Sequence, residues 1–379
     1  MANTTLEKWE EKTLDEVLNK VQYTSKIQSK LYKKEGKYPI ISQEDAFISG
    51  YWDNPNDVYH VKHPIVIFGD HTKVVKYINF DFVLGADGVK ILDPAKYINA
   101  KFLYYWTRYV PLRNLGYARH YKLLSKKTIR FPSLPEQERI VAKLDKAFEA
   151  IDKVKANAEQ NLTNAKELFE SLLNNWMNEL EPYDTVPLIN AYNFIDYRGV
   201  TPNKISSGVP LVTAKNVKKG YIDYTIKDFI SESDYTTRQS RGISLKGDIL
   251  FTTEAPLGNV ALADLEKFSA GQRIITFQQY PNSKYQLNNR FYCYFMQSKI
   301  FQNTIHSLAT GATAQGIKAS RLKLVNIPIV SYNKQNEIAQ RLDALQKQTK
   351  KLEQIYTQKI KECDELKQSI LQKAFRGEL

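Results

Sequence analysis

Two long stretches of the chain place apolar residues at the alternating four-and-three spacing of a heptad, which predicts two long helices. They cover residues 134–180 and 332–379, and neither contains Gly or Pro from about its first turn until its end. The first expected seam consists of Ile140, Leu144, Ala147, Ile151, Val154 and Ala158, followed by Leu162, Ala165, Leu168 and Leu172. The second consists of Ile338, Leu342, Leu345, Thr349, Leu352 and Tyr356, followed by Ile360, Cys363, Leu366 and Ile370.

The two helical stretches also repeat each other's sequence. LPEQERIVAKLD at 134–145 returns as YNKQNEIAQRLD at 332–343, a shift of 332 − 134 = 198 positions. Both seams move over by one residue at equivalent places, Leu162 and Ile360. Because a move in only one helix would put the side chains out of register, we expect an antiparallel pair of helices, each about 46 residues and roughly 70 Å long. The alternative is that each seam docks only on its neighbouring domain or mediates dimerisation; the matched shift favours the pair.

Two blocks precede and separate the helical stretches, and their sequences correspond loosely. Each block contains short apolar runs that predict strands, and an amphipathic segment opened by Asn that predicts a capped helix. Each ends in a basic turn and an apolar strand broken by Pro just before the long helix. The corresponding segments are 37–52 and 209–222, 63–70 and 246–253, 98–106 and 287–295, and 123–135 and 319–330. We therefore predict two mixed α/β domains with one ground plan and unlike loops, as two readers of different targets would have.

The positive charge of the chain lies in these two blocks. The net charge is +13 and the pI is near 9.3, which indicates a polyanionic partner. Residues 1–134 carry 21 Lys and Arg against 14 Asp and Glu, net +7, and residues 181–330 carry 17 against 11, net +6. The stretches 135–180 and 331–379 carry −3 and +3. A membrane-binding helix would concentrate its charge in one place, so two similarly basic globular blocks favour nucleic acid.

The composition sets further limits on the class of protein. With 379 residues and 42% apolar content the chain can form two domains with their own cores. No run approaches the ~18 apolar residues of a membrane span, so we expect a cytoplasmic protein. Cys293 and Cys363 form no CxxC pair, which predicts neither a disulfide framework nor a cysteine zinc site. His60, His63 and His71 lie close in sequence, but without Cys or well-spaced carboxylates we predict no metal site.

Motifs for catalysis are missing from the sequence. It contains no Asn/Asp-Pro-Pro-aromatic motif for a flipped adenine, no Gly-rich loop for a methyl donor and no P-loop for ATP. Asp70 beside His71, and Glu254 in TTEAP, could belong to a hydrolytic site. Single carboxylates in loops, however, more often accept from cytosine N4 or brace an arginine. We therefore expect no catalytic residues.

Candidate DNA contacts are long cations for phosphate and guanine, amides for adenine, and hydroxyls for positioning. GATAQGIK at 311–318 is favoured because its small residues let backbone N–H groups approach a phosphate while Gln315 and Lys318 point outward. For any single cation the alternative is an ordinary solvated charge. The candidates in the first block are Lys26, Lys30, Lys33, Lys34, His71, Lys73, Arg113, Arg119, His120 and Lys122. Those in the second are Arg198, Thr201, Lys204, Lys215, Asn216, Arg238, Arg241, Thr253, Glu254, Gln272, Arg273, Thr313, Gln315 and Lys318.

The order of these segments resembles the specificity subunit of a Type I DNA restriction-modification system. In that family two variable target-recognition domains alternate with two similar regions that form long antiparallel helices. The resemblance covers nearly the whole chain and rests on LPEQERIVAKLD followed by KELFESLL (166–173), on NIPI followed by KQNEIAQRLD, and on the terminal QKAFRGEL. One departure is SYNKQ (331–335), which lacks the usual Pro-rich start and leaves open where the second helix begins.

The resemblance implies a mixed α/β fold with pseudo-twofold symmetry. Its parts would be a recognition domain at 1–132, a spacer helix at 133–181, a second domain at 182–330 and a second helix at 331–379. Each domain would read one half of a split target in double-stranded DNA, and the helices would fix the gap. The helices would also dock two modification (N6-adenine methyltransferase) subunits, through which restriction (motor and nuclease) subunits join.

The same resemblance implies that S-adenosylmethionine, ATP and Mg bind only to those partner subunits, in a prokaryotic cytoplasm. Two other functions stay open from the residues alone. One is a self-contained DNA methyltransferase or nuclease, which would transfer methyl groups or cleave DNA by itself. The other is a coiled-coil scaffold that binds DNA without sequence preference, with an affinity that depends on salt but not on sequence.

Overall fold

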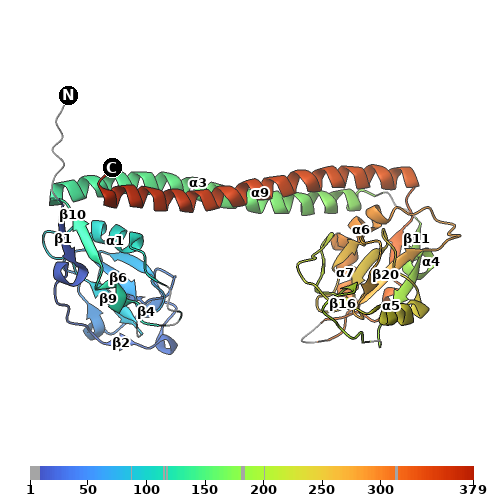
Figure 1. The fold of residues 1–379 in the computed structure, drawn as a ribbon, viewed down its shortest axis with the longest axis horizontal. Coiled ribbons are helices and arrows are strands. Elements are labelled where there is room, and N and C mark those ends of the chain that lie inside the picture. The colour runs from blue at the N-terminus through green and yellow to red at the C-terminus, as the bar shows by residue number, and fades with distance from the viewer. Residues whose placement is uncertain are drawn as a thin grey trace, which may run out of the picture. The chain divides into compact units, whose positions relative to one another are not determined.

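The computed structural model describes residues 9–86, 88–113, 116, 118–180, 184–199, 201–311 and 315–379. The chain divides into two compact units (Figure 1). The first unit holds residues 1–159 and 357–379, and the second holds residues 160–356. In the described part of the chain, no helix combines the length and the apolar character needed to cross a bilayer.

Two helices of 45 residues, α3 (Leu134–Asn178) and α9 (Tyr332–Arg376), contribute to both units. They begin at equivalent positions of the sequence repeat, so the missing Pro of SYNKQ does not move the start of the second helix. In the first unit Lys155 Nζ lies 2.6 Å from Asp364 Oδ1, and Lys367, one turn later on α9, bonds to Asp152, one turn earlier on α3. The predicted antiparallel pair is confirmed.

The seam between the helices differs in part from the predicted one. Ile140, Leu144, Ile151, Ile338 and Leu342 are buried, but the first three belong to the core of the first domain and the last two to that of the second. Leu162, Leu172, Ile360 and Ile370 are partly buried.

The prediction is wrong for Leu352, and for Val154, Leu168 and Leu366, which are 36–49% exposed. An α-helix has 3.6 residues per turn, so a strict 3.5-residue seam drifts by about 20° per heptad. The neighbouring positions, such as Lys155 and Lys367, therefore turn toward the partner helix and bury their aliphatic stems.

The described residues of the first globular domain form three sheets, all but the first made from strands within residues 26–92. Strands β1 (Glu10–Thr13) and β10 (Thr128–Phe131) pair antiparallel beside the start of α3. The second sheet contains β2 (Lys26–Ile27), β8 (Phe82–Gly85), β3 (Tyr38–Ile41) and β4 (Gly50–Trp52) in that order, with β5 (Val58–Tyr59) against β8. The third contains β7 (Val75–Ile78), β6 (Ile65–Gly69) and β9 (Val89–Leu92). Helices α1 (Ala100–Tyr109) and α2 (Tyr121–Leu124) complete the domain.

The globular domain of the second unit follows the same order with different details. Strands β11 (Thr185–Pro187) and β21 (Asn326–Pro328) pair as β1 and β10 do. One sheet has the order β12 (Tyr192–Asp196), β20 (Ile274–Gln279), β17 (Ile249–Thr252) and β18 (Val260–Leu262). Another has β16 (Phe229–Ile230), β13 (Val209–Val212) and β19 (Ser269–Ala270), and β14 (Val217–Lys218) pairs with β15 (Tyr221–Ile222). The short helices are α4 (Leu188–Ala191), α5 (Glu232–Arg238), α6 (Asn289–Gln297), α7 (Lys299–Ser307) and α8 (Ala319–Leu322).

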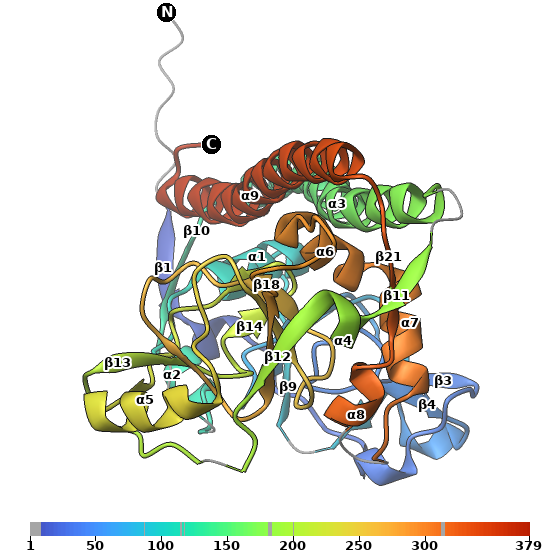
Figure 2. The same cartoon turned by 90° about the vertical axis from the view of Figure 1, so that its right-hand side faces the viewer.

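Helices α1 and α6 connect each domain core to a long helix. As predicted, each begins at an Asn cap: Asn99 accepts from two backbone N–H groups at the start of α1, and Asn288 does the same at the start of α6. Phe102 of α1 packs in one cluster with Phe68 of β6 and residues of α3. In the second unit α6 lies between α9 and the strands (Figure 2). The predicted pair of mixed α/β domains is confirmed.

Candidate DNA-recognition sites

A fully buried glutamine of α3 fixes the first domain to its helix. Gln137 is 0% exposed and accepts a hydrogen bond from the backbone N–H of Asn99 at 2.8 Å. Its amide donates to the carbonyls of Tyr97 and Pro132 at 3.0 and 2.9 Å. The side chain therefore joins the start of α1, the end of β10 and the first turn of α3.

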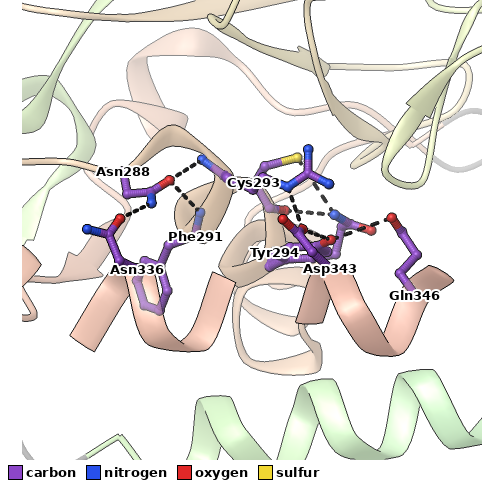
Figure 3. Close-up of polar contacts among 9 residues, drawn as sticks. Asn288, Phe291, Cys293, Tyr294, Asn336, Asp343 and Gln346 are labelled. Atoms are coloured by element: carbon purple, nitrogen blue, oxygen red, sulfur yellow. Dashed lines mark hydrogen bonds and ion pairs between the residues drawn. The ribbon is translucent and has the colours of Figure 1, made fainter. Parts of the chain in front are cut away.

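The second domain repeats this arrangement on α9. Gln335 is also 0% exposed and accepts from the backbone N–H of Asn288 at 2.7 Å. It donates to the carbonyls of Gln286 and Val330 at 3.0 and 2.7 Å. The cap residue Asn288 adds a bond to Asn336 at 2.5 Å (Figure 3).

A carboxylate two turns further along each long helix makes a second connection. Asp145 accepts from the Tyr105 hydroxyl at 2.5 Å, and Asp343 accepts from the Tyr294 hydroxyl at 2.7 Å (Figure 3). A cation on the same short helix also donates a hydrogen bond to each carboxylate. Lys101 lies 2.7 Å from Asp145, and Arg290 donates to Asp343. Burial, and then the bond to Asp, raise the pKa of both tyrosines, so the hydroxyls remain donors.

We call Gln137 with Asp145, and Gln335 with Asp343, the two clamps. Their residues are separated by the 198 positions of the repeat and are identical in type. The sequence phrase is therefore repeated because the same two side chains attach each domain to its long helix. These residues were not among the candidates predicted from the sequence, although their identity within two otherwise diverged phrases was a usable signal.

Three loops of the first domain meet at the buried Asp70. Its backbone N–H donates to the Gly88 carbonyl at 2.7 Å, and its carbonyl accepts from the N–H of His120 at 2.8 Å. The Asp70 carboxylate accepts from the N–H of Tyr121 at 2.7 Å. The first loop cluster therefore comprises the turn 70–73 after β6, the β8–β9 connection at Gly88, and residues 119–122.

The second domain builds the equivalent cluster around Thr253. The N–H of Thr253 donates to the Arg273 carbonyl at 3.0 Å, and its carbonyl accepts from the N–H of Ile317 at 3.0 Å. The next residue, Glu254, lies opposite Gly316 in an isolated antiparallel bridge and forms an ion pair with Arg273 at 3.0 Å. A Cβ at Gly316 would lie 3.1 Å from the Glu254 Cβ, so a larger residue would have to push Glu254 away by a few tenths of an ångström. The second loop cluster comprises 253–256, 271–273 and 315–318.

The same turn is strained in both domains. Lys73 has φ 62° and Ala255 has φ 49°, a left-handed conformation that non-glycine residues seldom adopt. Such conformations concentrate at functional sites, where the surrounding structure holds them in place. The two clusters thus share a backbone frame and differ in the side chains that they present.

The structure brings many of the predicted DNA contacts to these clusters. Those in the clusters are His71, Lys73, Arg119, Lys122, Glu254, Gln272, Arg273, Gln315 and Lys318, each at least partly exposed. Thr201 reaches Gln272 at 3.4 Å, and Arg241 donates to the Arg198 carbonyl at 2.8 Å. Lys26, Lys30, Lys33, Lys34, Arg113, Lys204 and Lys215 are exposed elsewhere on the domains. Thr313 lies outside the described residues.

Four of the predicted DNA contacts are wrong, because their side chains are buried and bonded inside the domains. His120 is 0% exposed and holds the place that Ile317 holds in the second domain, and Thr253 is 2% exposed at the centre of its cluster. Asn216 is 2% exposed and donates to the carbonyls of residues 223 and 226. Arg238 is 3% exposed and donates to Ser269 and to the Ala270 carbonyl. In the sequence these polar residues resemble DNA-contacting side chains, but in the structure they form hydrogen bonds inside the domains.

Several exposed cations are already paired with carboxylates. Lys33 lies 2.7 Å from Asp53, and Lys204 lies 2.7 Å from Asp228. The hydrogen bond from Lys33 holds the pKa of Asp53 below its usual range. Because each of these lysines lies beside a carboxylate, the two positions add little net positive charge to the surface.

The histidines of the HxxH stretch also pair with carboxylates. His60 Nδ1 lies 2.7 Å from Asp81 and His63 Nε2 lies 3.3 Å from Asp93. The two histidines thus contact different carboxylates. Across the described ranges of the chain, no three His, Cys, Asp or Glu side chains gather as a metal site would require.

Two domains of one design, each mounted by the same clamp on one of a pair of long antiparallel helices, define a duplicated recognition protein. The family model for the Type I restriction modification DNA specificity domain matches residues 6–164 and 174–362. The chain belongs to this family. It is a specificity subunit of a Type I restriction-modification system, the component that recognises DNA targets.

Individual relatives agree with this assignment. The chain is 25% identical over 341 residues to the EcoR124I/EcoR124II specificity subunit of Escherichia coli, covering 84% of this chain and 81% of that protein. It resembles a chain from a structural study of complex assembly in the type I R-M system, with a TM-score of 0.73 at 18% identity and 98% coverage of both chains. The HsdS subunit from Thermoanaerobacter tengcongensis has the same fold, with a TM-score of 0.55 at 19% identity, covering 98% of this chain and 97% of that one.

Proposed function

We propose that each domain reads one half of a bipartite DNA target through its loop cluster, and that α3 and α9 fix the gap between the halves. The observation that carries this proposal is the shared frame with unlike side chains: the backbones of Asp70 and Thr253 make the same two bonds, while the exposed residues around them differ. The shared backbone geometry would place both loop clusters against DNA in the same way. Their different side chains would then recognise different base sequences.

The second cluster offers a direct test of this division. Gln315 is exposed beside His306, whose Nδ1 lies 3.0 Å from its Oε1, and Arg273 is exposed beside Glu254. We expect Gln315→Ala or Arg273→Ala to weaken recognition of one half-site by roughly 10-fold to 100-fold, the usual cost of one lost base contact. The measurement is binding of the assembled complex to duplexes in which either half is scrambled, after mapping methylated adenines in the host genome has identified both halves.

Matched variants define the outcome. Lys73→Ala in the first cluster is expected to weaken recognition of only the half-site that Gln315→Ala leaves unaffected. Gln358→Ala, at an exposed position of α9, is expected to weaken recognition of neither half-site. Equal losses for both halves from Gln315→Ala would contradict independent readers. Equal affinity for every duplex of one length would instead indicate a non-specific DNA-binding scaffold.

We further infer that the helix pair carries two docking patches for two modification subunits. The four exposed apolar residues displaced from the seam form equivalent pairs across the repeat: Val154 corresponds to Leu352, and Leu168 to Leu366. In the antiparallel register, Val154 lies level with Leu366 in the first unit and Leu168 with Leu352 in the second. Each unit therefore presents one apolar pair on a charged helix surface, as two copies of one partner require.

Substitutions within these pairs test the docking. We expect Leu168→Glu to lower the number of bound modification subunits from two to one, because a buried charge would oppose docking at one patch only. The double variant Leu168→Glu, Leu366→Glu is expected to bind none. Mass measurement of complexes by native mass spectrometry reports the count. Leu324→Glu, at a residue 70% exposed on the second domain, is the control and keeps two; a double variant that also keeps two would contradict the patches.

The chain itself would contribute recognition without catalysis in this proposal. The modification subunits would supply S-adenosylmethionine and methyl transfer, and the restriction subunits that join through them would supply ATP, Mg and cleavage, in the prokaryotic cytoplasm. The purified chain is therefore expected to show no methyl transfer to DNA and no cleavage. Either activity in the purified chain would favour a self-contained methyltransferase or nuclease.

A further inference from the structure

The repeat that relates α3 to α9 preserves some residues and reverses others. The clamp residues are identical in the two copies, as described above. The sign of the charge, in contrast, is opposite at six pairs of equivalent positions: Glu136 and Lys334, Arg139 and Glu337, Glu149 and Lys347, Asp152 and Lys350, Lys155 and Glu353, and Lys166 and Asp364. The clamp residues are thus duplicated, whereas these six pairs have opposite signs. Four other charged pairs, Asp145 and Asp343 among them, keep their sign.

Three residues of the reversed pairs, Asp152, Lys155 and Asp364, lie at the interface of the helices in the first unit. Lys155 Nζ is 2.6 and 2.8 Å from the two carboxylate oxygens of Asp364, and Lys367 bonds to Asp152. The Lys155 and Lys367 side chains are only 26% and 14% exposed. These lysines therefore flank the buried contact between the helices, where charge sign affects which helix can pair.

In the second unit the equivalent positions lie where α3 and α9 meet the second domain. Lys155 is equivalent to Glu353 in the repeat, and Asp364 is equivalent to Lys166. In the second unit the cation therefore lies on the second half of α3 and the anion on α9. Lys166 and Glu353 line one cavity of about 590 Å³ together with Phe169 and Lys350. The same interface level thus recurs with its two signs exchanged.

This exchange has a consequence for pairing with a second copy of the chain. If α3 paired antiparallel with α3 of another copy in the same register, Lys155 would face Lys166. If α9 paired with α9, Glu353 would face Asp364 and Lys350 would face Lys367. Each contact would occur twice by symmetry, and like charges at such positions destabilise as much as opposite charges stabilise.

We propose that these charges form a pairing code, by which α3 and α9 accept each other within one chain and reject the same helix of a second copy. The apolar seams alone do not provide this choice, because the two helices repeat each other's apolar pattern and a homotypic pair would bury similar residues. The whole helices follow the same rule: α3 has six Lys and Arg against eight Asp and Glu, net −2, and α9 has ten against six, net +4. The code selects α3 with α9, so that every helix pair carries one first domain and one second domain.

The test uses the full chain and a double reversal, Lys155→Glu with Asp364→Lys. Within one chain the pair stays attractive, so the thermal midpoint is expected to remain close to that of the unchanged protein. Between two copies, the glutamate introduced at position 155 would face Lys166, and the lysine introduced at position 364 would face Glu353. These two homotypic contacts become attractive, while the contact between Lys350 and Lys367 is unchanged. After unfolding in urea and refolding at increasing concentration, we expect an association constant for the helix-exchanged dimer roughly 100-fold higher, measured by size-exclusion chromatography with light scattering.

A control applies the same charge changes away from the interface. Lys153→Glu with Glu362→Lys changes the net charge of each helix equally, and both residues are exposed. The control is expected to match the unchanged chain, and the difference is expected to disappear in 1 M NaCl, where charges are screened beyond about 3 Å. A double reversal that dimerises no more than the control would overturn the pairing code, and so would a difference that survives high salt.

Discussion

Replacing Gln335 with Ala is expected to release the second domain from α9 while the first domain stays mounted. The substitution leaves the N–H of Asn288 and the carbonyls of Gln286 and Val330 without their partner at a fully buried site. Each unsatisfied buried group costs about 1–3 kcal/mol, so the total loss should reach about 3–5 kcal/mol. Hydrogen exchange of residues 285–297 should accelerate by at least about 100-fold, with little change at residues 97–109.

The chain provides matched controls for this experiment. Gln137→Ala is expected to give the mirror result, with fast exchange at 97–109 and slow exchange at 285–297. Gln160→Ala and Gln358→Ala make the same substitution at exposed positions that are also equivalent in the repeat, and they should change neither segment. If Gln335→Ala left exchange at Asn288 unaltered, the clamp would not be what holds the domain.

Local features of the fold could be predicted from the sequence, whereas the hydrogen bonds of the clamps could not. The heptad pattern and the shift of 198 positions predicted two long helices but left open where the second begins. The Asn before each amphipathic segment predicted the caps of α1 and α6. These features depend on local spacing and on local hydrogen bonds, which a sequence displays directly. The clamp bonds join Gln137 to Asn99 and Gln335 to Asn288, 38 and 47 residues away, and such distant partners are not visible in a pattern.

The errors have equally specific causes. Asn216 and Arg238 have side chains that suit DNA, but their bonding groups are used by nearby carbonyls in the folded domain. Leu352 follows the strict heptad, yet 45 residues allow the ideal helix to rotate away from a 3.5-residue repeat. The same rotation that moved Leu352 and Leu168 out of the seam leaves them exposed on the helix pair, where a partner subunit could use them.

Removing one heptad from both helices at matched positions, residues 157–163 and 356–362, is expected to shorten the preferred gap by about three base pairs. Seven residues span about 10 Å at 1.5 Å per residue, and base pairs are about 3.4 Å apart. The matched removal keeps the antiparallel register and retains the Lys155–Asp364 pair, so the helices can still associate. Affinity should fall, because three base pairs also turn one half-site by about 100° around the DNA axis.

Selection from duplexes with randomised gaps measures the preference, and both half-site sequences should be unchanged. Removing 157–163 alone puts the two helices out of register and should abolish assembly. A matched variant that still selects the original gap would show that something other than the helices sets it.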